Sequence, residues 1–298
     1  MSPDSPRARI LSAVLPVLAV IGATAAFQVG AALAKGLFPI LGPQGTVTLR
    51  VVLGALMLAA MLRPWRRWPV GAPRLPILGL GAATAGATLF FYLAIERLPQ
   101  GVAIALQFLG PLAVAMIGSR RALDLVWAAL AAVGVWCLVG AGGVDGRPLD
   151  PLGVLFALAA AASWAAYILW GRAASAAFGA ATPAVALAIA ALIVTPVGVA
   201  HSGAALLQPE HLPLAALVAL VSTAIPFVLE MYALPRMPAR TFAILTSLEP
   251  AFGALFGLLL LSEILGASHV VGLAAVIAAA AGAALTSAPR PPPSPALN

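Results

Sequence analysis

Ten apolar runs, each long enough to cross a lipid bilayer as a helix, occupy almost the whole chain. Their centres lie near residues 20, 53, 86, 114, 133, 161, 189, 221, 255 and 276. A spanning helix needs about 20 mostly apolar residues. The segments between the runs, such as residues 64–76 and 142–151, are rich in turn-forming residues and too short for a soluble domain. This pattern predicts an all-α integral membrane protein with ten transmembrane helices.

The charge content points the same way and excludes several kinds of site. Hydrophobic residues make up 62% of the chain and charged residues only 8%, whereas soluble domains carry about 25%. Lipid must therefore contact much of the exterior. The net charge of +7 does not indicate nucleic-acid binding, because the basic residues are scattered through short loops instead of forming a patch. The single cysteine, Cys137, permits neither an intrachain disulfide nor a multi-thiolate metal site, and no metal or cofactor is expected.

The distribution of Lys and Arg predicts the orientation, since these residues favour cytoplasmic loops. With the N-terminus inside, the outer loops hold only Lys35, Arg97 and Arg147, and the other basic loop residues fall inside. We therefore expect a cytoplasmic N-terminus at residues 1–10, followed by a retained first span, and a disordered cytoplasmic tail at residues 288–298. The oligomeric state is not indicated by any pattern.

An internal repeat predicts how the spans are organised. Five positions recur at a constant offset of 139 residues, as the pairs Ala94 and Ala233, Arg97 and Arg236, Pro99 and Pro238, Pro111 and Pro250, and Gly118 and Gly257. Spans three and four then correspond to spans eight and nine, so the unit has five helices. An odd number of crossings forces the second unit to enter from the opposite side. The sequence thus predicts two inverted five-helix repeats, residues 11–143 and residues 151–287.

Three ionisable residues fall inside the predicted spans and are the leading site candidates. They are Arg50 in span two, Glu230 in span eight and Glu249 in span nine. A charge at the bilayer centre costs about 2.5–3.5 kcal/mol on insertion scales, so each is a candidate functional residue. The glutamates are candidates for binding a proton or a substrate amine, and Arg50 for binding a carboxylate. The alternative is that one glutamate pairs with Arg50 and only fixes the packing.

Proline positions predict where helices bend. Pro250 directly follows Glu249, and a proline inside a helix removes a backbone donor and frees a carbonyl one turn earlier. We expect kinks at Pro250 and at its equivalent, Pro111. Irregular backbone at mid-membrane depth is typical of transporter binding sites. Because Glu249 corresponds to Gly110, the expected polar chemistry is asymmetric between the halves.

Uncharged candidates for the substrate or proton site are Gln107, Thr223, Thr246, Trp164 and Tyr167. Small polar residues at helix interfaces are more often packing residues than ligands. The two aromatic residues can line a cavity or belong to an interfacial aromatic belt.

Residues near the span ends are expected to have structural or solvated roles and not to bind substrate. Lys35 is interpreted as an interface anchor. The three histidines, His201, His211 and His269, lie at loops or span ends without metal-ligand spacing and are expected to be solvated.

Several segments resemble a known family. They are residues 33–39, 49–50, 110–115, 119–127, 164–167, 222–224 and 229–231, with residues 236–263 the most specific. With the ten-span plan, these resemble the drug/metabolite transporter superfamily, and within it the bacterial threonine/homoserine exporters. The resemblance implies efflux of small hydrophilic amino acids across the bacterial inner membrane by alternating access, with proton antiport. Gln107 stands where those exporters have a glutamate, which puts substrate choice and coupling in question.

Two other functions are open at this point. The nearest is transport of another small metabolite or drug, since the superfamily fold hosts many substrates. An intramembrane enzyme or sensor is the distant alternative, and it needs a cluster of acids, histidines or nucleophiles at one depth. The sequence contains no phosphate-binding loop, zinc signature or nucleophile elbow, so no enzymatic activity is expected. The expected partners are a small amino acid, a proton and the lipid bilayer, without nucleic acid.

Overall fold

The computed structural model describes residues 6–117, 122–139 and 148–286. All regular structure in these ranges is helical, and they contain no strand. The expectation of an all-α protein is confirmed for this part of the chain.

The helices follow the apolar runs along the chain. The first half contains α1 (Pro6–Lys35), α2 (Phe38–Leu62), the 3-10 turn η1 (Pro64–Arg67), α3 (Arg74–Arg97), α4 (Gln100–Gln107), α5 (Leu109–Met116) and α6 (Ala122–Val139). The second half contains α7 (Pro151–Phe178), η2 (Gly179–Ala181), α8 (Thr182–Ser202), η3 (Gly203–Leu207), α9 (Leu212–Ala219), the π-helix η4 (Leu220–Ala224), α10 (Ile225–Ala233), η5 (Leu234–Arg236), α11 (Ala239–Thr246), α12 (Glu249–Leu261) and α13 (Ala267–Thr286).

Seven segments of the described chain are long and apolar enough to cross a membrane. They are Val14–Lys35, Phe38–Leu62, Arg74–Arg97, Pro151–Leu207, Leu212–Arg236, Thr241–Leu261 and Ala267–Thr286. The fourth of these has 57 residues and comprises α7 and α8 with their turns. Two shorter apolar helices, Gln100–Val114 and Leu125–Val139, cover the remaining runs. Large apolar side chains such as Leu192 and Trp136 are exposed, as expected of a surface that contacts lipid.

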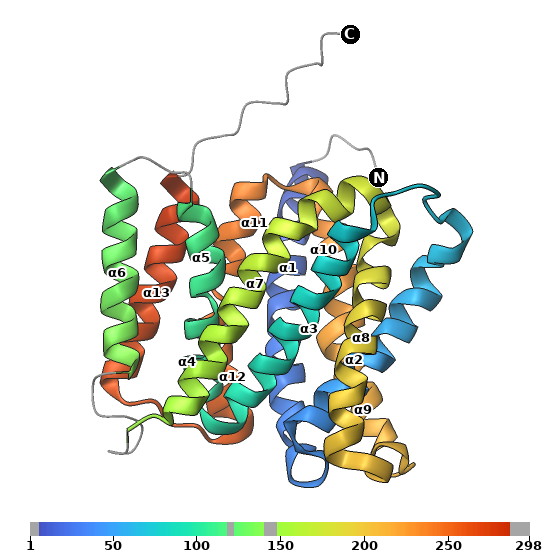
Figure 1. Ribbon diagram of the computed structural model, residues 1–298. Coiled ribbons are helices and arrows are strands. Elements are labelled where there is room, and N and C mark those ends of the chain that lie inside the picture. Colours follow the sequence, from blue (N-terminus) through green and yellow to red (C-terminus); the bar gives the residue numbers. More distant parts are fainter. Residues whose placement is uncertain (1–5, 118–121, 140–147, 287–298) are drawn as a thin grey trace.

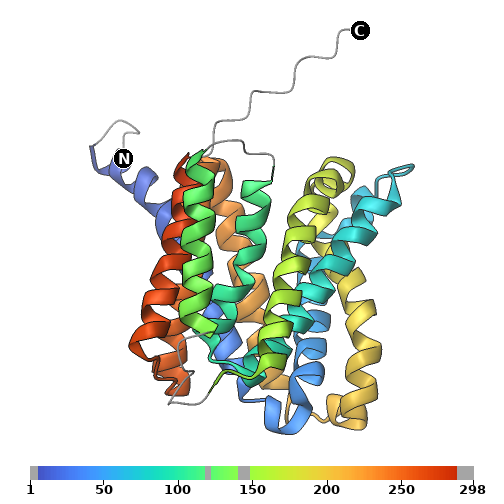
Figure 2. The same ribbon diagram turned by 60° about the vertical axis from the view of Figure 1, so that its left-hand side comes forward.

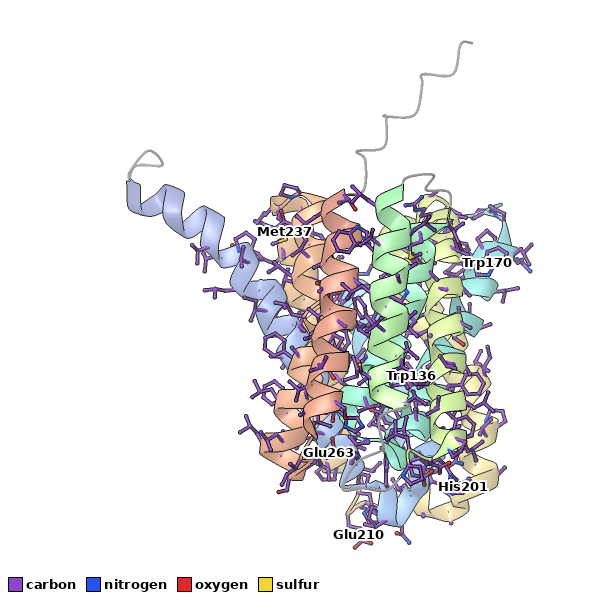
Figure 3. The ribbon with its side chains drawn as sticks, turned by 90° about the vertical axis from the view of Figure 1, so that its left-hand side faces the viewer. Trp136, Trp170, His201, Glu210, Met237 and Glu263 are labelled. Carbon is purple, nitrogen blue, oxygen red and sulfur yellow. The ribbon has the colours of Figure 1, made fainter. Side chains whose placement is uncertain are left out.

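The helices form one bundle. α6 and α13 pair at one edge, α2 and α8 pair at the other, and α3 packs against α7 between them (Figures 1 and 2). α1 begins and α13 ends at the same end of the bundle. Figure 3 places Met237 and Trp170 towards that end and Glu263, His201 and Glu210 towards the opposite one, which we call the distal end.

Glycines allow close packing where the two halves of the chain meet. A Cβ atom at Gly101 of α4 would lie 2.8 Å from Ala254 Cα of α12, and one at Gly134 of α6 would lie 3.0 Å from the Gly272 carbonyl oxygen of α13. Such small residues let membrane helices approach closely enough for backbone packing. The α4–α12 and α6–α13 contacts thus join helices of different halves.

Candidate functional site

The two intramembrane glutamates lie on two helices of the second half that share a packing partner. Glu230 is on α10 and Glu249 begins α12, and both helices pack against α1. The Glu230 carboxylate interacts electrostatically with Glu249 and with Tyr167 of α7. Both glutamates are half-buried, and Tyr167 is 42% exposed. Among the side chains that the structure describes, no Lys, Arg or His forms an ion pair with either acid.

Arg50 contacts a serine and a tyrosine instead of a glutamate. Its Nε donates a hydrogen bond to Ser222 Oγ at 2.8 Å, and its Nη2 donates to the Ser222 carbonyl at 3.2 Å. The guanidinium carbon lies 5.4 Å from the centre of the Tyr92 ring. The alternative in which Arg50 pairs with Glu230 or Glu249 is therefore wrong. Sequence reasoning missed Tyr92, which stands in an apolar run without a distinguishing motif.

Ser222 lies in the π-helix η4, an unusual element inside a membrane segment. The interruption separates α9 from α10, and it places Ser222 against α1. A Cβ atom at Gly30 of α1 would lie 3.0 Å from the Ser222 backbone nitrogen. Single π-helical turns are rare and often occur at functional sites. Here the turn carries the acceptor of Arg50.

A helix ends just before each of the two prolines that were predicted to cause kinks. α4 ends at Gln107 and α5 resumes at Leu109, two residues before Pro111. In the second half, α11 ends at Thr246 and α12 begins at Glu249, immediately before Pro250. The breaks therefore precede the prolines, as a freed carbonyl one turn earlier requires.

The uncharged candidates have mainly local contacts. Gln107 is buried at the end of α4, and Thr246 Oγ1 donates to the carbonyl of Ala243 at 3.1 Å. Thr223 packs on α2, since its Cγ2 would lie 3.0 Å from a Cβ atom at Gly54. None of these side chains forms a direct hydrogen bond with Arg50 in the described region.

Trp164 stabilises the break in the first half. Its ring meets that of Phe108 edge to face, with the centroids 5.6 Å apart. The same region has no room for a side chain at Gly110, because an added Cβ atom would collide with the carbonyl oxygen of Ala161 on α7. The equivalent position in the second half carries Glu249, so the asymmetry noted in the sequence has a steric cause in the first half.

A polar network at the distal end connects the two halves. Lys35 Nζ, at the end of α1, donates to Glu263 Oε1 at 2.6 Å, and Glu263 Oε2 accepts from the backbone N–H of Gln100 at 2.7 Å. The Gln100 amide in turn donates to the backbone carbonyl of Gln28 at 2.9 Å. Lys35 was expected to be an interface anchor, but it is bonded to a partner 228 residues away. Whether or not Lys35 also anchors the end of its span at the interface, it links the two halves of the chain.

A second ion pair lies near the start of α7. Arg97 Nη1 donates to Asp150 Oδ2 at 2.8 Å, and Asp150 Oδ1 caps α7 by accepting from the N–H of Leu152. The Arg97 hydrogen bond is the main reason why the pKa of Asp150 lies below its usual value, and the Leu152 hydrogen bond adds to this. The pair thus joins the end of α3 to the beginning of the second half.

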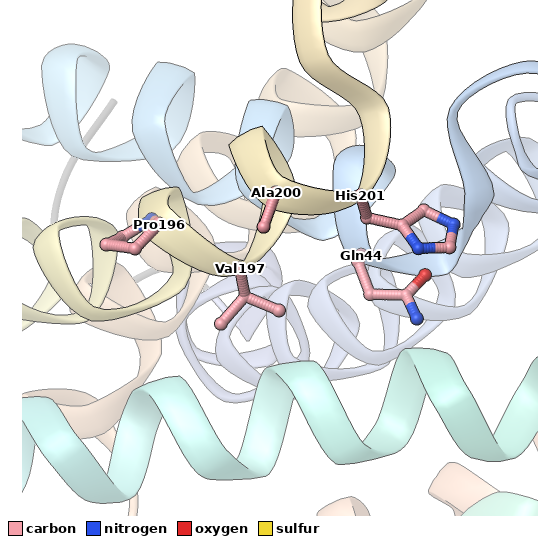
Figure 4. Close-up of a pocket in the computed structure, with 5 residues that line it drawn as sticks. All are labelled: Gln44, Pro196, Val197, Ala200 and His201. Atoms are coloured by element: carbon pink, nitrogen blue, oxygen red, sulfur yellow. The ribbon is translucent and has the colours of Figure 1, made fainter.

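A shallow surface pocket lies between α2 and α8, away from the acids. It is lined by Gln44, Pro196, Val197, Ala200 and His201 (Figure 4). The side-chain oxygen of Gln44 is buried there without a hydrogen-bond partner among the described residues. Apart from Gln44 and His201 its lining is apolar, so it offers few groups that could orient a polar solute.

Two of the three histidines depart from the expectation of solvated side chains: the His211 side chain is only 12% exposed, and His269 is buried. His201 is exposed, and His211 Nε2 lies 3.0 Å from Gln208 Oε1, whereas His269 is fully buried on α13. The prediction that His269 is solvated is wrong, because α13 begins two residues before it and packs against α6 and α11. No three His, Cys, Asp or Glu residues gather as a candidate metal centre in the part of the chain that the structure describes.

Comparison with known proteins identifies the family. Residues 151–285 match the EamA-like transporter family. Over 272 residues, the chain is 46% identical to proteins named threonine/homoserine exporter RhtA in Salmonella typhimurium (strain LT2) and Escherichia coli (strain K12), covering 91% of this chain and 92% of each relative. The chain belongs to the EamA-like transporter family. It is thereby a member of the drug/metabolite transporter superfamily, as its sequence motifs predict.

A solved structure shares the fold of this EamA-like transporter. It is described only as a crystal structure of a protein, superposes with a TM-score of 0.57 and is 19% identical, covering 90% of this chain and 96% of that one. The membrane-capable helices and the bacterial relatives together confirm a multi-pass protein of the bacterial inner membrane.

Proposed function

We propose that this protein exports small hydrophilic amino acids of the threonine and homoserine type across the inner membrane. The observation that carries the proposal is the 46% identity to threonine/homoserine exporters, which extends over 91% of the chain. The charged groups suit a zwitterion, because two acids and one guanidinium lie in helices of the same bundle. A solute that carries both an ammonium and a carboxylate needs partners of both signs.

The proposed architecture has ten spans in two inverted five-helix repeats, with both termini cytoplasmic. The repeats are residues 11–143 and 151–287, flanked by residues 1–10 and 288–298. The bounds of α4 and α11 support this, because they differ by 139 residues at both ends. Backbone angles agree as well: φ and ψ are −67° and −13° at Phe108, and −64° and −11° at its equivalent, Ser247.

Packing between the halves also has a reciprocal pattern. α7, the first helix of the second half, packs against α3 and α5, and α1 packs against α10 and α12. Under the 139-residue offset, α10 and α12 are the counterparts of the end of α3 and of α5. Each half thus packs its first helix against equivalent helices of the other, as a pseudo-two-fold axis in the membrane plane requires.

In the proposed transport cycle, alternating access moves the substrate past a site formed by both halves. Glu230 and Glu249 hold the substrate ammonium or an exchanged proton, and Arg50 holds the carboxylate. The Lys35–Glu263 pair keeps the distal end closed in this conformation. Proton antiport follows if substrate and proton compete for the same acids, because two neighbouring carboxylates are costly to keep charged together.

A second candidate is export of another small metabolite, favoured by one residue. Gln107 replaces a glutamate of the exporters that the chain resembles, and it is buried beside the break between α4 and α5. An amide cannot release a proton or neutralise an ammonium at that position. A counterflow screen of labelled amino acids in proteoliposomes at two pH values distinguishes the candidates.

The substrate class has a direct cellular test. Cells that lack their own exporters should tolerate excess homoserine or threonine when they express this protein, and their intracellular pools should fall. Unchanged tolerance together with unchanged pools, at normal protein levels in the membrane, would reject this substrate class.

Coupling is tested by Glu249→Gln. The amide keeps the shape of the side chain but cannot take part in proton exchange, so the variant should lose the pH dependence of transport in vesicles while its membrane level stays normal. Glu210→Gln is the matched control, because Glu210 has a 72% exposed side chain at the distal end. A normal pH profile for Glu249→Gln would remove this residue from the coupling mechanism.

A further inference from the structure

Arg50 is a membrane-embedded cation that lacks an anion within the described chain. It lies in the middle of α2, and no Asp or Glu among the described side chains forms an ion pair with it. A charge in a membrane helix is costly and is normally matched by a partner or used to bind a ligand. The missing anion is therefore expected to come from outside the protein.

Two of the five guanidinium N–H groups are already used. Nε donates to Ser222 Oγ and Nη2 donates to the Ser222 carbonyl. Ser222 Oγ itself donates to the Val218 carbonyl at 2.6 Å, which fixes its oxygen as an acceptor for Arg50. The remaining three N–H groups belong to the two terminal nitrogens, the edge with which arginine binds a carboxylate through two parallel hydrogen bonds.

Tyr92 adds a second donor close to the Arg50 guanidinium. Its ring lies under the guanidinium, 5.4 Å from the centroid to Cζ, and the charge of Arg50 acts on its hydroxyl. The residue is 1% exposed, yet the hydroxyl has no hydrogen-bond partner in the described part of the chain. Phe38 and Phe91 pack against the ring, with centroids 5.9 and 6.1 Å away, and hold its position.

An orphaned buried hydroxyl is unfavourable, and buried polar groups almost always have partners. A hydroxyl next to an unpaired guanidinium is suited to donate to the anion that the guanidinium binds. One cation with planar donors suits a planar monoanion better than a phosphate dianion.

We infer that Arg50 and Tyr92 form the subsite for the substrate's carboxylate, with Ser222 as the residue that positions the guanidinium. The inference rests on the proposed amino-acid transport and assigns the carboxylate to a defined pair of donors. Arg50 remains partly exposed, so the anion approaches from its open edge.

The test is counterflow of labelled L-threonine in proteoliposomes, with 1-amino-2-propanol, the same molecule without its carboxylate, as competitor. Tyr92→Phe keeps the ring and removes only the hydroxyl, so the fold should tolerate it. We expect its half-saturation concentration for threonine to rise about 10-fold to 100-fold, as for loss of a hydrogen bond to a charged group. Inhibition by 1-amino-2-propanol should not change.

Two further variants separate binding from positioning. Arg50→Lys keeps the charge but cannot bind a carboxylate through two parallel hydrogen bonds. Its affinities for threonine and for 1-amino-2-propanol should therefore become similar. Ser222→Ala should weaken threonine binding less than Arg50→Lys, because the Ser222 carbonyl still accepts from Nη2. Tyr232→Phe is the matched control, since Tyr232 also stacks on an arginine, Arg236, at 4.2 Å but is exposed.

The outcomes separate this inference from the proposed function. Equal threonine affinity in Tyr92→Phe and wild type, with both proteins folded, would overturn the subsite while leaving amino-acid export in place. If the wild type shows no threonine or homoserine counterflow, the proposed substrate fails. The subsite is then decided by thermal stabilisation of the wild type and Tyr92→Phe with glycine, β-alanine, inorganic phosphate and the amines methylamine and ethylamine. The subsite is supported if glycine and β-alanine stabilise the wild type more than the amines do and this difference is absent in Tyr92→Phe. Equal stabilisation by acids and amines, or stabilisation by phosphate alone, overturns it.

Discussion

The Lys35–Glu263 pair at the distal end should be energetically coupled, and the coupling can be worked out from its geometry. At 2.6 Å and an effective dielectric constant of about 20, the Coulomb attraction is about 6 kcal/mol before desolvation is subtracted. The two side chains are 20% and 15% exposed, between the surface pairs that contribute about 0–1 kcal/mol and buried pairs whose disruption costs about 3–5 kcal/mol. We therefore expect a coupling free energy of about 1–3 kcal/mol.

A double-mutant cycle measures this coupling. Lys35→Met removes the charge, and Glu263→Gln keeps an oxygen that can still accept from the Gln100 N–H. The free energies of unfolding of wild type, both single variants and the double variant are obtained from thermal unfolding in detergent micelles. The double variant should be more stable than the sum of the single effects predicts, because each single variant leaves one charge without its partner.

The Arg97–Asp150 pair provides the control within the same protein. Its 2.8 Å distance is similar, but its side chains are 36% and 35% exposed, so solvent screens the attraction and the coupling should be below about 1 kcal/mol. Additivity within about 0.5 kcal/mol for Lys35 and Glu263, or a coupling no larger than that of the control pair, would refute the closing role that we propose for this partly buried pair.

Two further predictions concern the Arg97–Asp150 pair and the contact between Gly110 and Ala161. The Arg97 hydrogen bond lowers the pKa of Asp150 below its usual value of 3.8. The ionised carboxylate therefore stabilises the fold above pH 3.8, and this contribution is lost as the pH falls through the lowered pKa. Asp150→Asn should reduce the fall in melting temperature below about pH 5, and the same dependence of melting temperature on pH as in the wild type would contradict this. Gly110→Ala should destabilise the protein by about 1–3 kcal/mol because its Cβ atom meets the Ala161 carbonyl, whereas the control Gly171→Ala, with 3.9 Å to the nearest atom, should be neutral or stabilising in the same melting assay.

The helical architecture could be predicted from the sequence because lipid imposes a simple rule. Backbone groups must be paired within each span, so apolar runs of sufficient length become helices. The runs around residues 114, 221 and 255 are divided, into α4 and α5, α9 and α10, and α11 and α12. Pro111 and Pro250 indicate where the first and the last of these breaks fall. The 139-residue offset was visible in the sequence because Pro99 and Pro111 have the same spacing as Pro238 and Pro250.

Side-chain partners could not be predicted in the same way, because they depend on how distant helices pack. Arg50 was identified as a candidate from its position in a span, but its partner Ser222 is 172 residues away. Tyr92 resembles any other aromatic residue of an apolar run, and only its proximity to the guanidinium distinguishes it. Lys35 was assigned to the interface because nothing in the sequence indicates that Glu263 lies beside it.

The tight contact at Gly110 has a consequence for the energetics of transport. In a protein built from two equivalent halves, the inward-facing and outward-facing conformations arise by exchanging the shapes of the halves. In the alternating-access cycle that we propose, this exchange is not neutral, because Gly110 lies against the Ala161 carbonyl while its counterpart is the carboxylate of Glu249. The two conformations then differ in free energy even without a gradient, and the empty protein should rest mainly in one of them. Ligand binding would then have to offset this difference in one half of the proposed cycle, and the reverse step would release it.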